Sequence, residues 1–241
     1  MVKLIVFDLD GVLVDARELH YQALNMALKD IDDSFVIERD EHLSTYDGLS
    51  TTKKLQMLSE RKGLPEKFHH TVWKTKQQKT IEIIDSFDYD HRIIKILKRL
   101  KLDGYTIACA TNSIRDTAKL QLIRRGFFEH IDFLYSNQDV TKPKPSAEIY
   151  MRCMIRANVD PHETVVIEDS HHGRKAALNS GAHLCAVKNS SDVNYDKIKE
   201  TIDKVNKKEN VRPKWQGGKM NVLIPMAGAG SRFQQAGYTF P

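Results

Sequence analysis

Short apolar runs rich in β-branched residues recur along this chain, and from residue 91 onward they alternate with segments of helical spacing. Such runs are typical of parallel strands that are buried on both faces. We expect five strands, at residues 4–7, 106–110, 131–135, 164–167 and 184–187. Helical spacing lies near residues 92–102, 114–125, 147–157, 172–180 and 194–206. The alternation predicts an α/β fold with right-handed strand–helix–strand units, a doubly wound, Rossmann-like parallel sheet covered on both faces.

Residues 16–86 interrupt this alternation with amphipathic helical patterns and no convincing strand. The patterns, with the residues that separate them, are 16–28, 52–58 and 70–84, with Gly48, Gly63 and Pro65. We interpret 16–86 as a helical cap inserted into a core domain formed by residues 1–15 and 87–206. Ligands bind such sheets beyond the carboxyl ends of the strands, so a cap inserted there is well placed to act as a lid.

The charge and the cysteines narrow the class of protein. The net charge is +5, but the lysines are spread along the chain, and the denser runs 74–79 and 204–219 lack the interleaved aromatic residues of a single-strand platform. We therefore expect no nucleic-acid partner. Three separated cysteines beside apolar neighbours fit reduced core thiols better than disulfides or a zinc site. The chain has no apolar run of about 18 residues, so we expect no membrane partner and a cytoplasmic location.

Asp8 and Asp10 follow the first expected strand and are the most informative acids of the chain. Residues i and i+2 of an extended backbone point the same way, so both carboxylates would share one side of the strand end. Two ionised carboxylates about 4 Å apart repel by roughly 4 kcal/mol at an effective dielectric of 20, which calls for a cation. A lysine or a hard metal ion can supply it.

Glu168 and Asp169, at the exit of the fourth expected strand, offer the oxygen ligands that Mg²⁺ prefers. The alternative interpretation of these acids is a solvated acidic turn together with a helix N-cap at Asp169.

The sequence resembles the haloacid dehalogenase superfamily, and within it the β-phosphoglucomutase-like branch with a helical cap. The segments similar to its four motifs, in the family's order, are Asp8–Asp15, Ala110–Ser113, Lys142–Pro145 followed by Glu148–Tyr150, and Val166–Ser170 followed by Gly173. The resemblance covers residues 1 to about 205.

The resemblance implies a role for most of these residues. Asp8 would be the nucleophile that forms an aspartyl-phosphate, and Asp10 the acid and base. Mg²⁺ would be held by Asp8, the Asp10 carbonyl and Asp169, with Glu168 nearby. Phosphoryl oxygens would be held by a further set of residues: Lys142, Thr111 and backbone donors at Asn112, with Ser113 and Arg115 beside them. Helix capping is the alternative role of Thr111 and Ser113.

Several cap positions bear on the choice between a phosphatase and a phosphomutase. Thr51 stands where the mutases carry an arginine for the distal phosphate of the substrate, and the loss of that cation weakens the case for a mutase. Arg115 also departs from the mutase pattern. His20 and Lys76 match mutase positions that help close the site, although a packed histidine and a solvated lysine are the alternative interpretations.

Residues 207–220 are polar and charged and are expected to be a linker. Residues 221–241 begin with an apolar strand and a glycine-rich turn, and Asn221–Phe233 resembles the opening of a sugar nucleotidyltransferase. We expect this segment to be the truncated start of that domain, covalently linked to the phosphatase in a longer polypeptide.

These observations together predict a Mg²⁺-dependent phosphatase, a phosphoric monoester hydrolase acting on a small phosphorylated substrate. A sugar phosphate or bisphosphate in nucleotide-sugar synthesis is the expected class. The alternatives are a phosphomutase that supplies sugar 1-phosphate, and an inactive phosphate-binding domain that regulates the linked nucleotidyltransferase.

Overall fold

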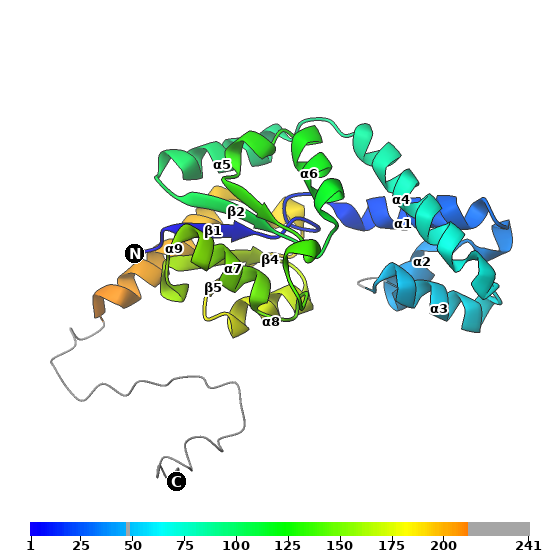
Figure 1. Cartoon of the computed structure of the whole chain (residues 1–241). Helices are drawn as coiled ribbons and strands as arrows, with labels where there is room; N and C mark the ends of the chain where they lie inside the picture. Colours follow the sequence, from blue (N-terminus) through cyan, green and yellow to red (C-terminus); the bar gives the residue numbers. More distant parts are fainter. Residues whose placement is uncertain (47–48, 212–241) are drawn as a thin grey trace, which may run out of the picture. The chain divides into compact units, whose positions relative to one another are not determined.

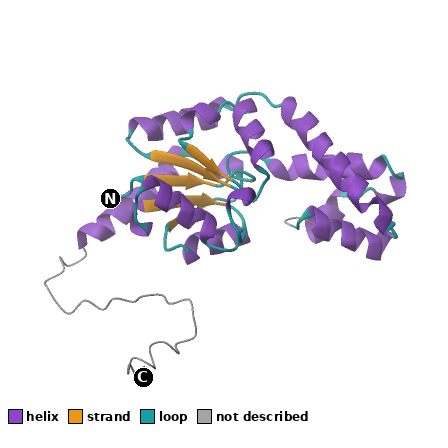
Figure 2. Ribbon diagram, in the orientation of Figure 1, coloured by secondary structure: helices purple, strands orange, loops and turns teal. Residues whose placement is uncertain are grey.

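The computed structural model describes residues 1–46 and 49–211, and contacts group Met1–Asn210 into one unit. Its sheet has five parallel strands in the order β3-β2-β1-β4-β5. The strands are drawn in orange in Figure 2, with helices around them. The strands are β1 (Leu4–Phe7), β2 (Thr106–Ala110), β3 (Phe133–Tyr135), β4 (Thr164–Glu168) and β5 (His183–Ala186). The predicted doubly wound parallel sheet is confirmed, because the chain moves outward from β1 first on one side and then on the other.

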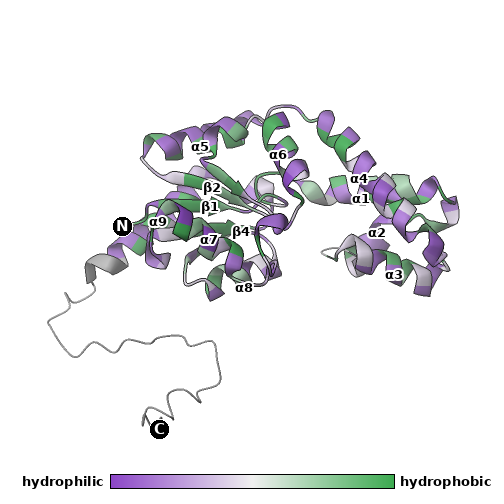
Figure 3. Cartoon of the chain, in the orientation of Figure 1, coloured by the Kyte–Doolittle hydropathy of each residue, from purple (hydrophilic) through white to green (hydrophobic). Residues whose placement is uncertain are grey.

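Helices cover both faces of this sheet (Figure 1). The core helices are α5 (His91–Leu102), α6 (Arg115–Arg124), α7 (Glu148–Ala157), α8 (His171–Asn179) and α9 (Tyr195–Val211). Side chains alternate along β1: Ile5 and Phe7 pack in one cluster with α5, α6 and α9, whereas Leu4 and Val6 pack in the other with α7 and α8. The strands are therefore apolar on both faces, as their hydropathy shows (Figure 3).

The cap is helical over its described residues, 16–46 and 49–86. Its helices are α1 (Ala16–Lys29), η1 (Asp33–Phe35), α2 (Arg39–Glu41), η2 (His42–Tyr46), α3 (Thr51–Lys62), η3 (Glu66–Phe68) and α4 (His69–Asp85). They bury a core of their own that includes Leu24, Leu28 and Leu58. A smaller cluster of Ala16, Leu19 and Ile84, with Leu120 of α6 packed against it, lies where the cap joins the core.

The end of α9 corrects one prediction. We expected a helix to residue 206 and a linker from 207, but the helix continues to Val211. Lysine and glutamate are good helix formers, so the charged residues 207–209 continue the last helix instead of breaking it. The rest of the expected linker and the segment 221–241 lie outside the described residues.

Two further expectations concern residues within the described part of the chain. Cys109, Cys153 and Cys185 are buried free thiols, as predicted. A search of the described helices finds none long and apolar enough to cross a membrane.

Candidate active site

The predicted acids gather at the carboxyl ends of the central strands. Asp8 directly follows β1, and its backbone N–H donates to the carbonyl of Ile167 on β4 at 3.0 Å. Phe7 pairs with Cys109 on β2 and with Ile167, so the three strands end level with one another. Asp8 and Glu168 are thereby brought to one edge of the sheet from positions 160 apart in the chain.

A buried ammonium group, that of Lys144, joins these acids. Its Nζ donates to Asp8 Oδ1 at 2.6 Å, to Glu168 Oε1 at 2.7 Å and to the carbonyl of Ala110 at 2.8 Å. All three of its protons are used. The hydroxyl of Tyr150 also donates to Glu168 Oε1, at 2.7 Å, so Glu168 is held from two sides although its side chain is fully buried.

The sequence analysis assigned this position to the wrong lysine. Lys142 is exposed, and its backbone N–H donates to Glu148 Oε2 at 2.9 Å. The lysine of the next Lys-Pro pair, Lys144, is buried instead, and its peptide bond to Pro145 is cis. Asn112 fixes it there, because Asn112 Oδ1 accepts from the Lys144 N–H at 3.0 Å and Asn112 Nδ2 donates to the Lys144 carbonyl at 3.3 Å. The side chain of Asn112 therefore positions a lysine.

Asp10 lies beside this centre among polar side chains. Its Oδ2 accepts from Ser113 Oγ at 2.5 Å and from Thr111 Oγ1 at 3.5 Å. Its Oδ1 accepts from Gln121 Nε2 at 3.5 Å, and His20 Nε2 lies 3.9 Å from the same oxygen. The structure thus brings Thr111 and Ser113 to the site, where both contact Asp10.

The electrostatics of the centre favour an added cation. Burial, and next the neighbouring Glu168 carboxylate, raises the pKa of Asp8 well above its usual value. Burial lowers the pKa of Lys144, but Asp8 and then Tyr150 and Glu168 raise it, and the balance is a pKa well above the usual value, so Lys144 keeps its proton. The Lys144 ammonium thus balances the carboxylates of Asp8 and Glu168, while the repulsion between these two acids still raises the pKa of Asp8.

The carboxylates of Asp8, Glu168 and Asp169 fit a hard divalent cation. Each offers an oxygen, and these oxygens lie within 4.8 Å of one another. Two glycines make room for them: a Cβ at Gly11, whose φ is +92°, would lie 2.3 Å from Asp169 Oδ2, and a Cβ at Gly173 would lie 1.8 Å from Glu168 Oε1. The expected contribution of the Asp10 carbonyl to the metal stays a prediction.

The cap brings His20 to Asp10, and Lys76 to His20. Lys76 Nζ lies 3.4 Å from His20 Nδ1, and the opposite ring nitrogen of His20 faces Asp10. Burial, and then the charge of Lys76, lowers the pKa of His20 to about 4, so the imidazole is neutral at pH 7. Burial and then Lys54 lower the pKa of Lys76 to about 8.

The structure does not bring all the predicted cap and loop residues to this centre. Arg115 begins α6, is exposed, and its guanidinium pairs with Asp139. Thr51 is the first residue of α3, directly after the helix cap Ser50. For both residues a role in substrate binding stays a prediction.

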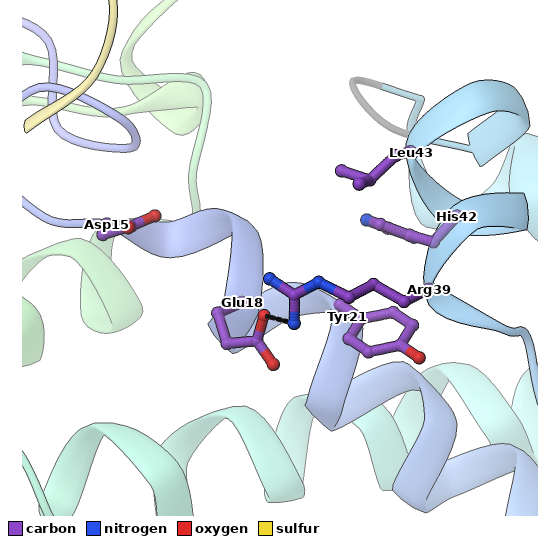
Figure 4. Close-up of a pocket in the computed structure, with 6 residues that line it drawn as sticks. All are labelled: Asp15, Glu18, Tyr21, Arg39, His42 and Leu43. Atoms are coloured by element: carbon purple, nitrogen blue, oxygen red, sulfur yellow. Dashed lines mark ion pairs between the residues drawn. The ribbon is translucent and has the colours of Figure 1, made fainter.

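A cavity of about 170 Å³ lies between α1 and the α2–η2 segment of the cap (Figure 4). Its lining residues are Asp15, Glu18, Tyr21, Arg39, His42 and Leu43. Arg39 Nη1 pairs with Glu18 Oε2 at 2.8 Å across it. The cavity is therefore lined by acidic and basic side chains that can form hydrogen bonds.

The sequence analysis missed Lys144, Tyr150, Gln121 and Lys54. Tyr150 and Gln121 lie on helical faces that hydrophobic periodicity assigns to the core. Periodicity does not reveal that a polar atom on such a face points towards the site. Lys54 follows Lys53 in a polar helical segment that is typical of a solvated helix face. The signal for Lys144 was available, because Lys-Pro occurs twice in succession and either lysine fits the motif.

Comparison with known proteins relates these features to a family. Residues 5–187 match the haloacid dehalogenase-like hydrolases. Pyrophosphatase PpaX from Bacillus velezensis is 26% identical over 196 residues, which cover 77% of this chain and 83% of that protein. The phosphorylated carbohydrates phosphatase of Thermotoga maritima is 26% identical over 192 residues, which cover 75% of this chain and 82% of that protein.

The fold also has close counterparts among solved structures. The crystal structure of β-phosphoglucomutase from Clostridium difficile superposes with a TM-score of 0.67 at 20% sequence identity, covering 85% of this chain and 98% of that one. The likeness shows a shared fold.

We expect Mg²⁺ to stabilise the folded chain, because a cation that binds the assembled carboxylates favours the folded state. At about 100 times its Kd, free Mg²⁺ should raise the free energy of unfolding by about 2.7 kcal/mol. Asp169→Asn should lose most of that gain, measured by urea unfolding with and without Mg²⁺. Glu60→Gln, at an exposed position on α3, is the control and should keep it. Equal stabilisation of Asp169→Asn and wild type would contradict this metal site.

Proposed function

Because the chain belongs to the haloacid dehalogenase-like hydrolases, we propose that it is a Mg²⁺-dependent phosphatase that hydrolyses a small sugar phosphate or bisphosphate through a phosphorylated Asp8. The observation that carries the proposal is the buried contact of Lys144 with Asp8 and Glu168 at the carboxyl edge of the sheet, with Asp10 beside it. Phosphoryl transfer through an acyl phosphate needs an oriented carboxylate as the nucleophile and a second acid beside it for proton transfer.

In the first half of the reaction Asp8 is the nucleophile. Lys144 holds one carboxylate oxygen of Asp8 and so fixes the direction of the other. Attack by Asp8 on phosphorus forms the aspartyl-phosphate and breaks the bond between phosphorus and the ester oxygen. Asp10 gives its proton to that oxygen, and the alcohol leaves.

In the second half water replaces the alcohol. Asp10, now ionised, takes a proton from a water molecule as the water oxygen attacks phosphorus. The bond between phosphorus and Asp8 breaks, and inorganic phosphate leaves with both aspartates restored. Ser113 and Gln121 hold Asp10 by different oxygens, which keeps its carboxyl in place for both proton transfers.

Charge on the transferred group is balanced by Lys144 and by the metal. Mg²⁺ bound by Asp8, Asp169 and the Asp10 carbonyl, with Glu168 nearby, would supply electrostatic stabilisation of the phosphoryl oxygens. Lys144 takes the role that we first gave to Lys142. The Thr111 hydroxyl and the backbone N–H of Asn112 are the further donors proposed for the phosphoryl oxygens.

The names of the relatives support the substrate class. One is a pyrophosphatase and the other a phosphatase of phosphorylated carbohydrates, each 26% identical to this chain. We extend the second of these substrate classes to this chain. We also propose that the enzyme works in the cytoplasm in nucleotide-sugar synthesis, covalently linked to a nucleotidyltransferase that begins near residue 221, outside the described residues.

A phosphomutase is the second candidate, and one contact favours it. Lys76, His20 and Asp10 form a chain from the cap to the core, at 3.4 Å and 3.9 Å. A mutase needs such closure, because water must be excluded while the substrate reorients. Thr51 stands where the mutases carry an arginine for the distal phosphate of the substrate. The absence of that cation favours the phosphatase.

Steady-state assays against a panel of sugar mono- and bisphosphates with Mg²⁺ test this function. We expect release of free phosphate, and we expect Asp8→Asn to abolish it because the nucleophile is lost. Isomerised ester without net phosphate release would instead support the mutase. Silence on every substrate would support an inactive binding domain, and activity that survives in Asp8→Asn would show that Asp8 is not the nucleophile.

The two neighbouring lysines give a matched pair of variants. Lys144→Ala should lower kcat by about 10² to 10³, because a charge preorganised at the phosphoryl group is lost, whereas Lys142→Ala should stay within about twofold of wild type. Circular dichroism and thermal unfolding check that both variants are folded. A larger loss in Lys142→Ala than in Lys144→Ala would contradict our assignment.

A further inference from the structure

Gln121, on α6, is a polar side chain with no exposed surface. Its Nε2 donates to Asp10 Oδ1 at 3.5 Å. Its carbonyl oxygen, Oε1, is also buried and accepts no hydrogen bond from any residue in the described part of the chain. A buried acceptor without a donor is costly to the folded state and rare in proteins, so Oε1 requires an explanation.

The contact with Asp10 fixes which way the amide faces. An ionised carboxylate accepts hydrogen bonds and donates none, so Gln121 presents Nε2 to Asp10 and not Oε1. The nitrogen and oxygen of an amide lie about 2.2 Å apart, which places Oε1 about 4 to 5.5 Å from Asp10 Oδ1. A water molecule that donates to two oxygens at about 2.8 Å each bridges a gap of this size.

The two oxygens of Asp10 differ in how strongly they are held. Oδ2 accepts from Ser113 Oγ at 2.5 Å and from Thr111 Oγ1 at 3.5 Å. Oδ1 accepts the long bond from Gln121, and His20 Nε2 lies 3.9 Å from it, which is beyond hydrogen-bond distance. The Asp10 side chain is 25% exposed, so water reaches it. Oδ1 is therefore the oxygen better placed to take a proton from water.

A water molecule that attacks phosphorus must direct both of its O–H groups elsewhere. One O–H gives its proton to the general base, here Asp10. The other O–H is kept and becomes a hydroxyl of the phosphate product, so it needs an acceptor during the attack. Gln121 Oε1 is a buried acceptor at a suitable distance from Asp10, and side-chain amides orient the attacking water in other phosphoryl-transfer enzymes.

We propose that Gln121 is a positioning residue for hydrolysis of the aspartyl-phosphate: Nε2 orients Asp10, and Oε1 orients the attacking water. This inference rests on the proposed function, since it assumes a phosphorylated Asp8. The water oxygen bonds to phosphorus, the bond between phosphorus and Asp8 breaks, and Asp10 receives one proton. The second proton of the water stays on the oxygen that enters the phosphate.

These contacts belong to the core and not to the cap. Thr111 and Ser113 follow β2, and Gln121 lies on α6, whereas the cap residue His20 makes no hydrogen bond to Asp10. The base and the acceptor for water therefore stay in place when the cap moves. A phosphorylated Asp8 then meets an oriented water after the alcohol has left, which favours hydrolysis over transfer to a second alcohol.

Acetyl phosphate separates the two halves of the reaction, because acetate leaves as an anion and needs no proton from Asp10. The protein with Mg²⁺ is labelled with ³²P-acetyl phosphate and chased with unlabelled acetyl phosphate in a rapid-quench apparatus. Gln121→Met, which keeps the length of the side chain, should slow the loss of label about 10- to 100-fold, because a hydrogen bond to a charged group is lost. The rate of labelling should change by less than about threefold.

The matched control is Gln56→Met, the same substitution at an exposed position of α3, which should leave both rates unchanged. Urea unfolding checks that both variants are folded. A purely structural role of Gln121 would lower the two rates together, so the difference between them is the decisive readout.

The outcomes separate this inference from the proposed function. Unchanged loss of label in Gln121→Met, or equal slowing of labelling and loss, would overturn the role of Gln121 alone. A wild-type protein that takes up no label would contradict the covalent mechanism and this inference with it. Selective slowing in Gln121→Met, in a protein that releases no phosphate from any sugar phosphate, would support the role of Gln121 and count against the proposed substrate class.

Discussion

The contact of the Lys144 ammonium with the carboxylates of Asp8 and Glu168 is the interaction on which the site depends. Without the ammonium, the carboxylates of two strands would lie uncompensated at a buried edge of the sheet. Removal of one partner of a buried ion pair typically destabilises the folded protein by about 3 to 5 kcal/mol. The surrounding residues hold the two sides of this contact in place. Asn112 clamps the backbone on both sides of Lys144, Tyr150 binds Glu168 from the other direction, and the strand register holds the carboxylates level.

Asp10 links this rigid centre to the cap. Ser113 and Gln121, from the core, hold its two oxygens, whereas His20 approaches one of them from α1. Proton transfer in the proposed mechanism is thus placed where core and cap meet, and nucleophilic attack is placed wholly in the core. This division fits a protein in which the core supplies the reaction and the cap supplies the selection of the leaving group.

The sequence predicted features that depend on a repeating pattern of residues, but not the direction in which a single side chain points. Apolar runs predicted all five strands to within two residues, because burial on both faces allows few other residue types. Asp8, Glu168 and Asp169 were found because acids after strands of one sheet must converge. The choice between Lys142 and Lys144 depended on the path of one loop, and the inward direction of Lys54 depended on packing within the cap, which periodicity does not encode.

The central claim is that the carboxylate of Asp8 carries the phosphoryl group during turnover. Rapid acid quench of the enzyme with ³²P-labelled substrate, followed by borohydride reduction and mass spectrometry, measures this directly. The account predicts that label stays with the denatured protein and that reduction converts residue 8 to homoserine. Label on any other residue, or none at any time during turnover, would contradict it.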